Sequence, residues 1–182
     1  MSDRVTKAAL LGLGTVGTGV YKVLKSQEEE MSAKVGCKVE ITRILVRNVE
    51  KAAAKVKDPS VLTNSWESIL EDPEIEIVIE LIGGINPARE YILQALNAGK
   101  HVVTANKDLI AVHGHELLDA AHAKKVDFLF EAAVAGGIPI IRPLKQCLAG
   151  NHMTEVMGIV NGTTNLFLTK MPQEGWGLRV DL

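Results

Sequence analysis

Apolar and polar positions alternate along the chain in blocks that predict strands separated by helices. Short runs rich in β-branched residues, each bounded by polar residues, are typical of strands in a sheet. They lie at Ala8–Leu11, Val39–Val46, Ile75–Ile82, His101–Thr104 and Val126–Phe130. Strands that alternate with helices form βαβ units with right-handed crossovers. We therefore expect an α/β fold of the Rossmann type, with a doubly wound and mostly parallel sheet.

The segments between these strands carry helix signals. Helices are predicted from Thr15 to about Met31, over Lys51–Lys57, from Ser65 through Leu70, from Asn86–Pro87 to about Ala98, and over His113–Lys125. For the fourth helix we expect Asn86 as the N-cap, Pro87 as the first helical residue and Gly99 as the stop.

The last part of the chain has a different character. A helix is predicted at Ile140–Leu148, a strand at Met153–Val160 that leaves the first domain, and a further helix that starts at Thr164–Lys170. We expect the first domain, which contains the sheet, to cover residues 1–150. Residues 151–182 then form the beginning of a second domain.

A glycine-rich turn follows the first predicted strand. Residues Leu11–Gly17 read LGLGTVG, in which Gly12, Gly14 and Gly17 have the G-x-G-x-x-G spacing. The first glycine permits a tight turn, the second lets backbone approach a pyrophosphate, and the third lets the helix pack on the strand. The helix N-terminus offers unpaired N–H groups to the phosphates. Three glycines can also form an ordinary loop, but the strand before them and the helix after them favour dinucleotide binding.

The end of the second predicted strand bears on the type of cofactor. An acidic residue there would bind a ribose hydroxyl and favour NAD, but this position holds Arg47, followed by Asn48. A guanidinium can pair with a 2′-phosphate and stack on adenine, which favours NADP. Arg47 can also be a plain surface arginine, and Glu50 lies close enough to keep NAD as an alternative.

Two later strand ends carry candidate chemistry, because ligands of open parallel sheets lie beyond the carboxyl ends of the strands. Lys107 follows the strand His101–Thr104 and could contact a substrate carboxylate, a hydroxyl or a nicotinamide carboxamide. The alternative is an exposed loop lysine. Glu131 opens a glycine-rich turn whose carbonyl groups suit a hard cation, or it simply caps that turn.

Composition narrows the classes of function. The 182 residues are 47% hydrophobic with a net charge of −2, and no basic block that would indicate nucleic-acid binding is present. No apolar run is long enough to cross a membrane, and the N-terminus lacks a signal-peptide core. The two cysteines, Cys37 and Cys147, fit buried positions in a reducing cytosol, so we expect a cytoplasmic protein. The five histidines have no zinc-site spacing.

Several stretches together resemble homoserine dehydrogenase of the bacterial aspartate pathway. They are LGLGTVG at 11–17, LIGG at 81–84, ANKDLIA at 105–111, EAAVAGGIPII at 131–141 and IVNGTTNLFLTKM at 159–171. The glycine motif is generic, whereas the last two stretches are far more specific. The resemblance implies reversible NAD(P)-dependent interconversion of homoserine and aspartate 4-semialdehyde, on the route to threonine and methionine.

The resemblance implies that residues 1–150 form an NAD(P)-binding domain and that residues 151–182 begin the substrate or dimerisation domain. It also implies roles for individual residues. The pyrophosphate would lie on the turn formed by Gly12, Leu13, Gly14, Thr15, Val16 and Gly17, and the adenosine end on Arg47. Thr104 and Gly162 would line the cofactor site, and Lys107 would lie beside the nicotinamide and the substrate as the catalytic residue. A sodium-type monovalent cation would be held by Glu131 and the backbone carbonyls of Val134, Gly136 and Ile138.

The chain departs from that family after Met171, where it reads PQEGWGLRVDL and stops. The family's usual continuation supplies an acidic substrate ligand, a second lysine and most of the dimer sheet. We therefore expect cofactor binding with poor turnover, and a homo-oligomer weakened by truncation. Two alternatives remain, namely a non-catalytic NADP-binding module and a semialdehyde dehydrogenase. The latter needs a nucleophilic cysteine, and Cys147 lies in a predicted helix away from the strand ends.

Overall fold

The computed structural model describes residues 4–158 and 162–174, apart from the side chains at positions 163 and 167. The chain forms two compact units, Met1–Ile141 and Arg142–Leu182. The predicted domain boundary, at residue 150, lies beyond Ile141, where the first compact unit ends. The assignment of residues to domains stays a prediction. Among the described residues, no helix has the length and apolar character to traverse a lipid bilayer.

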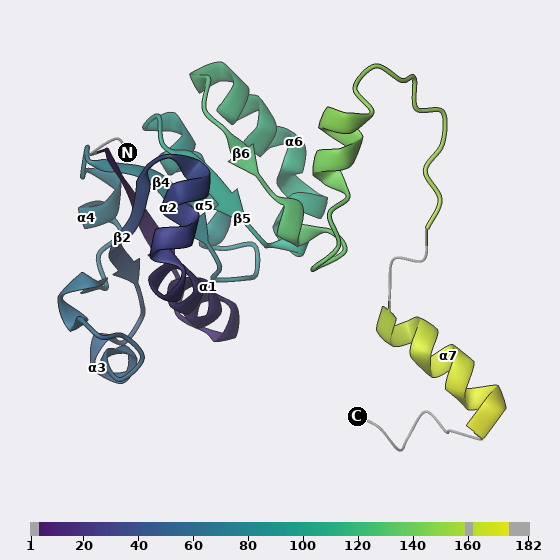
Figure 1. Ribbon diagram of the computed structural model, residues 1–182, viewed down its shortest axis with the longest axis horizontal. Coiled ribbons are helices and arrows are strands. Elements are labelled where there is room, and N and C mark those ends of the chain that lie inside the picture. The colour runs from purple at the N-terminus through teal and green to yellow at the C-terminus, as the bar shows by residue number, and fades with distance from the viewer. Residues whose placement is uncertain (1–3, 159–161, 175–182) are drawn as a thin grey trace. The chain divides into compact units, whose positions relative to one another are not determined.

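The first unit is built on one sheet, in which six parallel strands have the order β3-β2-β1-β4-β5-β6 (Figure 1). This is the strand order of a Rossmann fold and confirms the predicted fold class. The strands are β1 (Val5–Leu11), β2 (Lys38–Leu45), β3 (Leu62–Thr63), β4 (Ile75–Glu80), β5 (His101–Thr104) and β6 (Phe128–Leu129). The two-residue strand β3 was not predicted.

Helices connect the strands. They are α1 (Thr15–Ser26), α2 (Glu28–Val35), α3 (Val49–Ala53), α4 (Glu67–Leu70), α5 (Ala88–Asn97) and α6 (Lys107–Lys124), with 3-10 turns at Pro59–Val61 and Glu131–Ala133. The second unit contributes a π-helical turn at Pro143–Cys147 and α7 (Gly162–Glu174).

Alternate residues of β1 divide the core between the two faces of the sheet. Ala8 and Leu10 pack with residues of α1 and α3, including Tyr21 and Ala52. Ala9 and Leu11 pack on the opposite side, with α4, α5 and α6. All four β1 residues are fully buried. Two apolar faces covered by helices explain the nearly continuous apolar run at the end of this strand.

The predicted crossover helix from Thr15 to about Met31 is wrong as a single element. It ends at Ser26, and a second helix begins at Glu28. The acidic run Glu28–Glu30 occupies the first turn of α2, where negative charge suits the helix dipole. Glu28 also forms an ion pair with Lys38 at 2.9 Å.

Two further helix starts differ from the prediction. Pro87, which was expected at the first helical position, is the N-cap of α5, and Asn86 makes no capping hydrogen bond to it because the helix begins one residue later, at Ala88. The predicted helix His113–Lys125 begins at Lys107 instead. The side chain of Asn106 accepts a hydrogen bond from the Leu109 amide at 3.2 Å and so caps the longer helix.

The strand predicted at Met153–Val160 is also wrong where it can be checked, because residues 153–158 have no regular structure and residues 159 and 160 lie outside the described part. The predicted helix Ile140–Leu148 is shorter and π-helical in its main part. The helix expected from Thr164 begins at Gly162 and runs to Glu174.

Candidate functional site

The glycine turn has the geometry that its spacing predicts. A Cβ at Gly12, whose φ is +93°, would lie 2.9 Å from the Leu81 carbonyl oxygen. A Cβ at Gly17 would lie 2.1 Å from the Gly12 carbonyl oxygen, so α1 packs directly on the turn. A Cβ at Gly14 would meet nothing within 4 Å. The first and third glycines therefore permit close backbone packing, and the second leaves open space at the start of α1, where N–H groups are unpaired.

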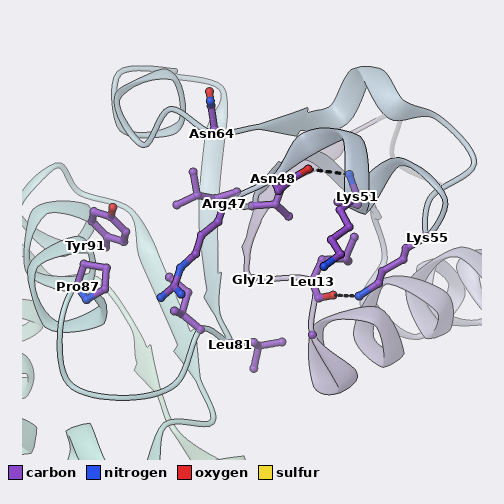
Figure 2. A pocket seen from close by; sticks show the side chains of 15 residues that line it. Gly12, Leu13, Arg47, Asn48, Lys51, Lys55, Asn64, Leu81, Pro87 and Tyr91 are labelled. Carbon is purple, nitrogen blue, oxygen red and sulfur yellow. Dashed lines mark hydrogen bonds between the residues drawn. The ribbon is translucent and has the colours of Figure 1, made fainter.

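A cavity of about 670 Å³ opens on this turn (Figure 2). Its size suits a small-molecule ligand or part of a cofactor. The lining residues come from the glycine turn, the ends of β2 and β4, α3 and α5. They are Gly12, Leu13, Gly14, Leu45, Val46, Arg47, Asn48, Lys51, Ala52, Lys55, Asn64, Leu81, Ile82, Pro87 and Tyr91.

The charged residues that line the cavity are all basic, namely Arg47, Lys51 and Lys55. Figure 2 shows Arg47 extending from the end of β2 toward Pro87, and the two lysines lying on the side of α3. The Lys55 ammonium donates a hydrogen bond to the Leu13 carbonyl at 2.9 Å and so joins this side to the glycine turn. With no acidic side chain in its lining, the cavity favours a ligand with several negative charges.

Tyr91 forms part of the cavity wall on the side away from these lysines (Figure 2). The Tyr91 ring, which lines the cavity, stacks on buried Trp66 with ring centroids 4.7 Å apart and an interplanar angle of 26°. The Trp66 indole N–H donates to the side-chain oxygen of Gln94. Trp66 therefore packs in the core and supports a residue of the cavity wall.

The structure brings only some of the predicted cofactor residues into the lining of this cavity. Gly12, Leu13, Gly14 and Arg47 line it. Thr15 and Val16 are exposed in the first turn of α1, and Gly17 is buried against Gly12. Three other predicted positions are elsewhere: Thr104 is buried, Lys107 is exposed at the start of α6, and Gly162 belongs to the second unit.

A buried polar network joins the ends of β4 and β5. Glu80 is 0% exposed, and its carboxylate accepts hydrogen bonds from the Ile82 amide at 2.7 Å, the Gly83 amide at 3.2 Å and the Thr104 hydroxyl at 2.6 Å. The Thr104 oxygen in turn accepts from the Asn106 amide at 3.0 Å. Sequence reasoning missed this network, although a carboxylate that ends the apolar strand Ile75–Glu80 was a signal for it.

The loop after β6 contains the predicted cation ligands. The Glu131 carboxylate accepts hydrogen bonds from the amides of Ile140 at 2.6 Å and Ile141 at 2.9 Å, so it caps the following turn. Within the loop, the Val134 amide donates to the Glu131 carbonyl and the Ile138 amide to the Ala135 carbonyl. These two bonds do not use the carbonyls of Val134, Gly136 and Ile138, which are the predicted cation ligands. One carboxylate and three backbone carbonyls are oxygen ligands of the kind that a hard cation prefers, although Glu131 also caps the following turn.

Over residues 4–158 and 162–174, no group of three or more His, Cys, Asp or Glu side chains is arranged to hold a metal ion. A cation at Glu131 would therefore depend on one carboxylate and backbone carbonyls.

A parallel Rossmann sheet whose glycine turn opens onto a cationic cavity has the architecture of a dinucleotide-binding domain. A family model described as "Homoserine dehydrogenase, NAD binding domain" matches residues 12–131, and one described as "Homoserine dehydrogenase" matches residues 139–180. The chain belongs to the homoserine dehydrogenase family. The resemblance found in the sequence is thereby confirmed, and a semialdehyde dehydrogenase is excluded as its family.

Individual relatives agree with this assignment. The homoserine dehydrogenase of Bacillus subtilis (strain 168) is 47% identical over 171 residues, which are 94% of this chain and 40% of that protein. The crystal structure of a homoserine dehydrogenase from Thiobacillus denitrificans matches with a TM-score of 0.88 and 47% identity, over 95% of this chain and 40% of that one. The chain thus spans about 40% of the length of these relatives.

A more distant match shows the fold alone. A hyperthermophilic archaeal homoserine dehydrogenase, solved in complex with NADPH, has a TM-score of 0.79 at 24% identity, over 94% of this chain and 57% of that one.

Proposed function

We propose that this chain binds NADP(H) for the interconversion of homoserine and aspartate 4-semialdehyde, in the cytoplasm and on the route to threonine and methionine. The observation that carries the proposal is the glycine turn that opens onto a cavity lined by basic residues. The family assignment supplies the substrate, and the family model of an NAD binding domain over residues 12–131 supports a nicotinamide cofactor.

The residues of the cavity fit the parts of such a cofactor. The open space at Gly14 and the unpaired amides at the start of α1 suit a pyrophosphate. Arg47, Lys51 and Lys55 suit the additional phosphate of the adenosine end, because a cationic lining is what separates an NADP site from an NAD site. Glu50, the residue that kept NAD as an alternative, is not in the lining.

Lys107 is proposed as the catalytic residue. It is exposed at the first position of α6, directly beyond the end of β5, on the edge of the sheet where ligands bind. A bound nicotinamide supplies the hydride chemistry. The Lys107 ammonium then stabilises the negative charge that develops on the substrate oxygen, or holds the substrate in place.

We propose that Glu131 and the carbonyls of Val134, Gly136 and Ile138 hold a monovalent cation such as sodium. A ligand that binds only the folded state raises its stability. The Tm should therefore be higher in sodium chloride than in tetramethylammonium chloride of the same ionic strength, and this difference should shrink in Glu131→Gln. Equal Tm values in the two salts would contradict the cation site.

The decisive experiment titrates the chain with NADPH and NADH by calorimetry and then assays homoserine oxidation. We expect NADPH to bind more tightly. Loss of a charge-assisted hydrogen bond costs about 1.5–3 kcal/mol, so Arg47→Ala should reduce the preference for NADPH by roughly tenfold or more. Lys57→Ala, an exposed lysine outside the cavity lining, is the control.

The same experiment separates the two functions that the sequence left open. Turnover of homoserine supports a dehydrogenase, and NADPH binding without turnover supports a cofactor-binding module. If neither NADPH nor NADH binds, both proposals are wrong. Sedimentation with and without NADPH would test the proposed homo-oligomer.

A further inference from the structure

Glu80 is a carboxylate with no exposed surface, at the C-terminal end of β4. Burial of a charged group is costly unless its hydrogen bonds are satisfied, and a packed apolar side chain is often no less stable. Glu80 receives three donors, two from the backbone of its own loop and one from the Thr104 hydroxyl on the neighbouring strand. Packing alone does not explain a carboxylate at this position, and its hydrogen-bond partners indicate a further role.

The first two hydrogen-bond partners of Glu80 belong to the loop that contributes to the cavity wall. The amides of Ile82 and Gly83 both point at one oxygen of Glu80, at 2.7 and 3.2 Å. Ile82 lines the cavity, and the amide of Leu81 beside it donates to the carbonyl of Leu11, the residue before Gly12, at 2.9 Å. The Glu80 carboxylate thus fixes the conformation of the loop that faces the proposed cofactor.

The second set of partners leads to the start of α6. The Thr104 hydroxyl donates to Glu80 and accepts from the Asn106 amide. The Asn106 side chain uses both of its ends, because its nitrogen donates to the Gly84 carbonyl at 2.6 Å and its oxygen caps α6 at the Leu109 amide. The residue that follows Asn106 is Lys107. The network therefore connects the cavity wall to the backbone that carries the proposed catalytic lysine.

We propose that Glu80 is a positioning residue that, through Thr104 and Asn106, holds Lys107 and the loop at Ile82–Gly84 in a single arrangement around the nicotinamide end of the cofactor. This inference rests on the proposed function, because it requires Lys107 to act at that end. Glu80 itself is too buried to touch the ligand, so its influence passes through its hydrogen-bond partners.

Two probes separate positioning from general stability. NADPH occupies both ends of the cofactor site, whereas adenosine 2′,5′-bisphosphate occupies only the end near Arg47. Glu80→Gln keeps the shape of the side chain but leaves the Thr104 hydroxyl without its acceptor. We expect about tenfold weaker binding of NADPH, with binding of the bisphosphate unchanged within about twofold. Thr104→Val should show the same split, and Thr104→Ser, which keeps the hydroxyl, should restore NADPH binding.

Matched variants complete the test. Thr6→Val makes the same change in a buried threonine at the opposite end of the sheet, beside Cys37, and should alter neither affinity. If Thr104→Val does not fold, Asn106→Asp keeps the cap on α6 but removes the donor to Gly84, and it should reproduce the split.

The outcomes identify which idea fails. Lys107→Ala should weaken NADPH binding without affecting the bisphosphate, and if it does not, the proposed role of Lys107 is wrong. If the unmodified chain binds neither probe, the proposed function is wrong. If Lys107→Ala gives the split but Glu80→Gln leaves both affinities unchanged, or lowers both equally, only the positioning role of Glu80 is overturned.

Discussion

The β1–α1–β2 half of the sheet and the β4–α5–β5–α6 half are built on different principles. The first half achieves close packing by omitting side chains at Gly12 and Gly17, so that backbone contacts backbone. The second half is joined by polar side chains that reach between elements, among them Glu80, Lys100 and Arg89. Stability of the first half should therefore be lowered most by an added side chain, and stability of the second half by loss of a hydrogen-bond partner.

The largest effect is expected in the first half, at Gly17. Gly17→Ala places a methyl group 2.1 Å from the Gly12 carbonyl oxygen, so α1 must move away from the turn. We expect a loss of about 3 kcal/mol or more in the free energy of unfolding, together with loss of NADPH binding. Urea unfolding measures the first and calorimetry the second.

The control for this change lies two residues further along the same helix. A Cβ at Gly19 meets nothing within 4 Å, so Gly19→Ala should stabilise the chain by about 0.5–1 kcal/mol through helix propensity. Similar losses in the two variants would show that close packing at Gly17 is not what sets this half apart.

In the second half, Lys100 offers the next largest effect. It is 5% exposed, and its ammonium donates to the carbonyls of Asp72 at 2.6 Å and Ile75 at 2.9 Å. Burial lowers the pKa of Lys100 despite the nearby charge of Asp72. Lys100→Met leaves two carbonyls without this donor, so we expect a loss of about 1–3 kcal/mol. Exposed Lys57→Met should change stability by less than about 0.5 kcal/mol.

A smaller and pH-dependent effect is expected at the ion pair that joins α5 to α6. Arg89 binds Glu116 through two nitrogens, and this hydrogen bonding lowers the pKa of Glu116 below its usual 4.5. The unfolded chain therefore binds more protons at acid pH. The stabilisation is present above about pH 4.5 and is lost as the pH falls through the lowered pKa of Glu116.

Urea unfolding between pH 6 and pH 3 would measure this dependence. The stability difference between the unmodified chain and Glu116→Gln should shrink as the medium becomes more acidic. Glu71→Gln, at an exposed position at the end of α4, should show no such convergence. A difference that stays constant over this range would contradict the role assigned to the pair.

The smallest expected effect comes from one substitution, threonine to valine, made once in each half of the sheet. Among the described residues, the Thr42 hydroxyl in β2 is a buried oxygen with no hydrogen-bond partner. Thr42→Val should therefore be neutral or stabilise the chain by up to about 1 kcal/mol. Thr104→Val removes a hydroxyl with two partners and should be destabilising in the same unfolding assay. Equal results would show that these two threonines do not differ as proposed.

The difference between the halves also explains what the sequence could predict. The close approach of Gly17 to Gly12 joins two residues of the same short turn, so the spacing of the glycines could predict it. The partners Glu80 and Thr104 are 24 residues apart, and only the pairing of β4 with β5 brings them together. For the same reason Lys51 and Lys55 were not recognised as cavity residues, although Arg47 was.

The wrong helix bounds in the prediction also have physical causes. The crossover from β1 to β2 was predicted as one helix because its composition is helical throughout, and nothing in the pattern marks the break at Gln27. The start of α6 was missed by six residues because Asn106 was not recognised as the cap of the helix. Local composition predicts the type of an element better than its ends.

The stacking of Tyr91 on Trp66 gives the chain an optical property that could be useful. An indole held beneath the cavity wall emits light in the range that a dihydronicotinamide absorbs, so a reduced cofactor bound nearby should quench it. The second tryptophan, Trp176, lies outside the described residues, and Trp176→Phe would leave Trp66 as the sole indole. Occupancy of the cavity could then be followed in real time without an added label.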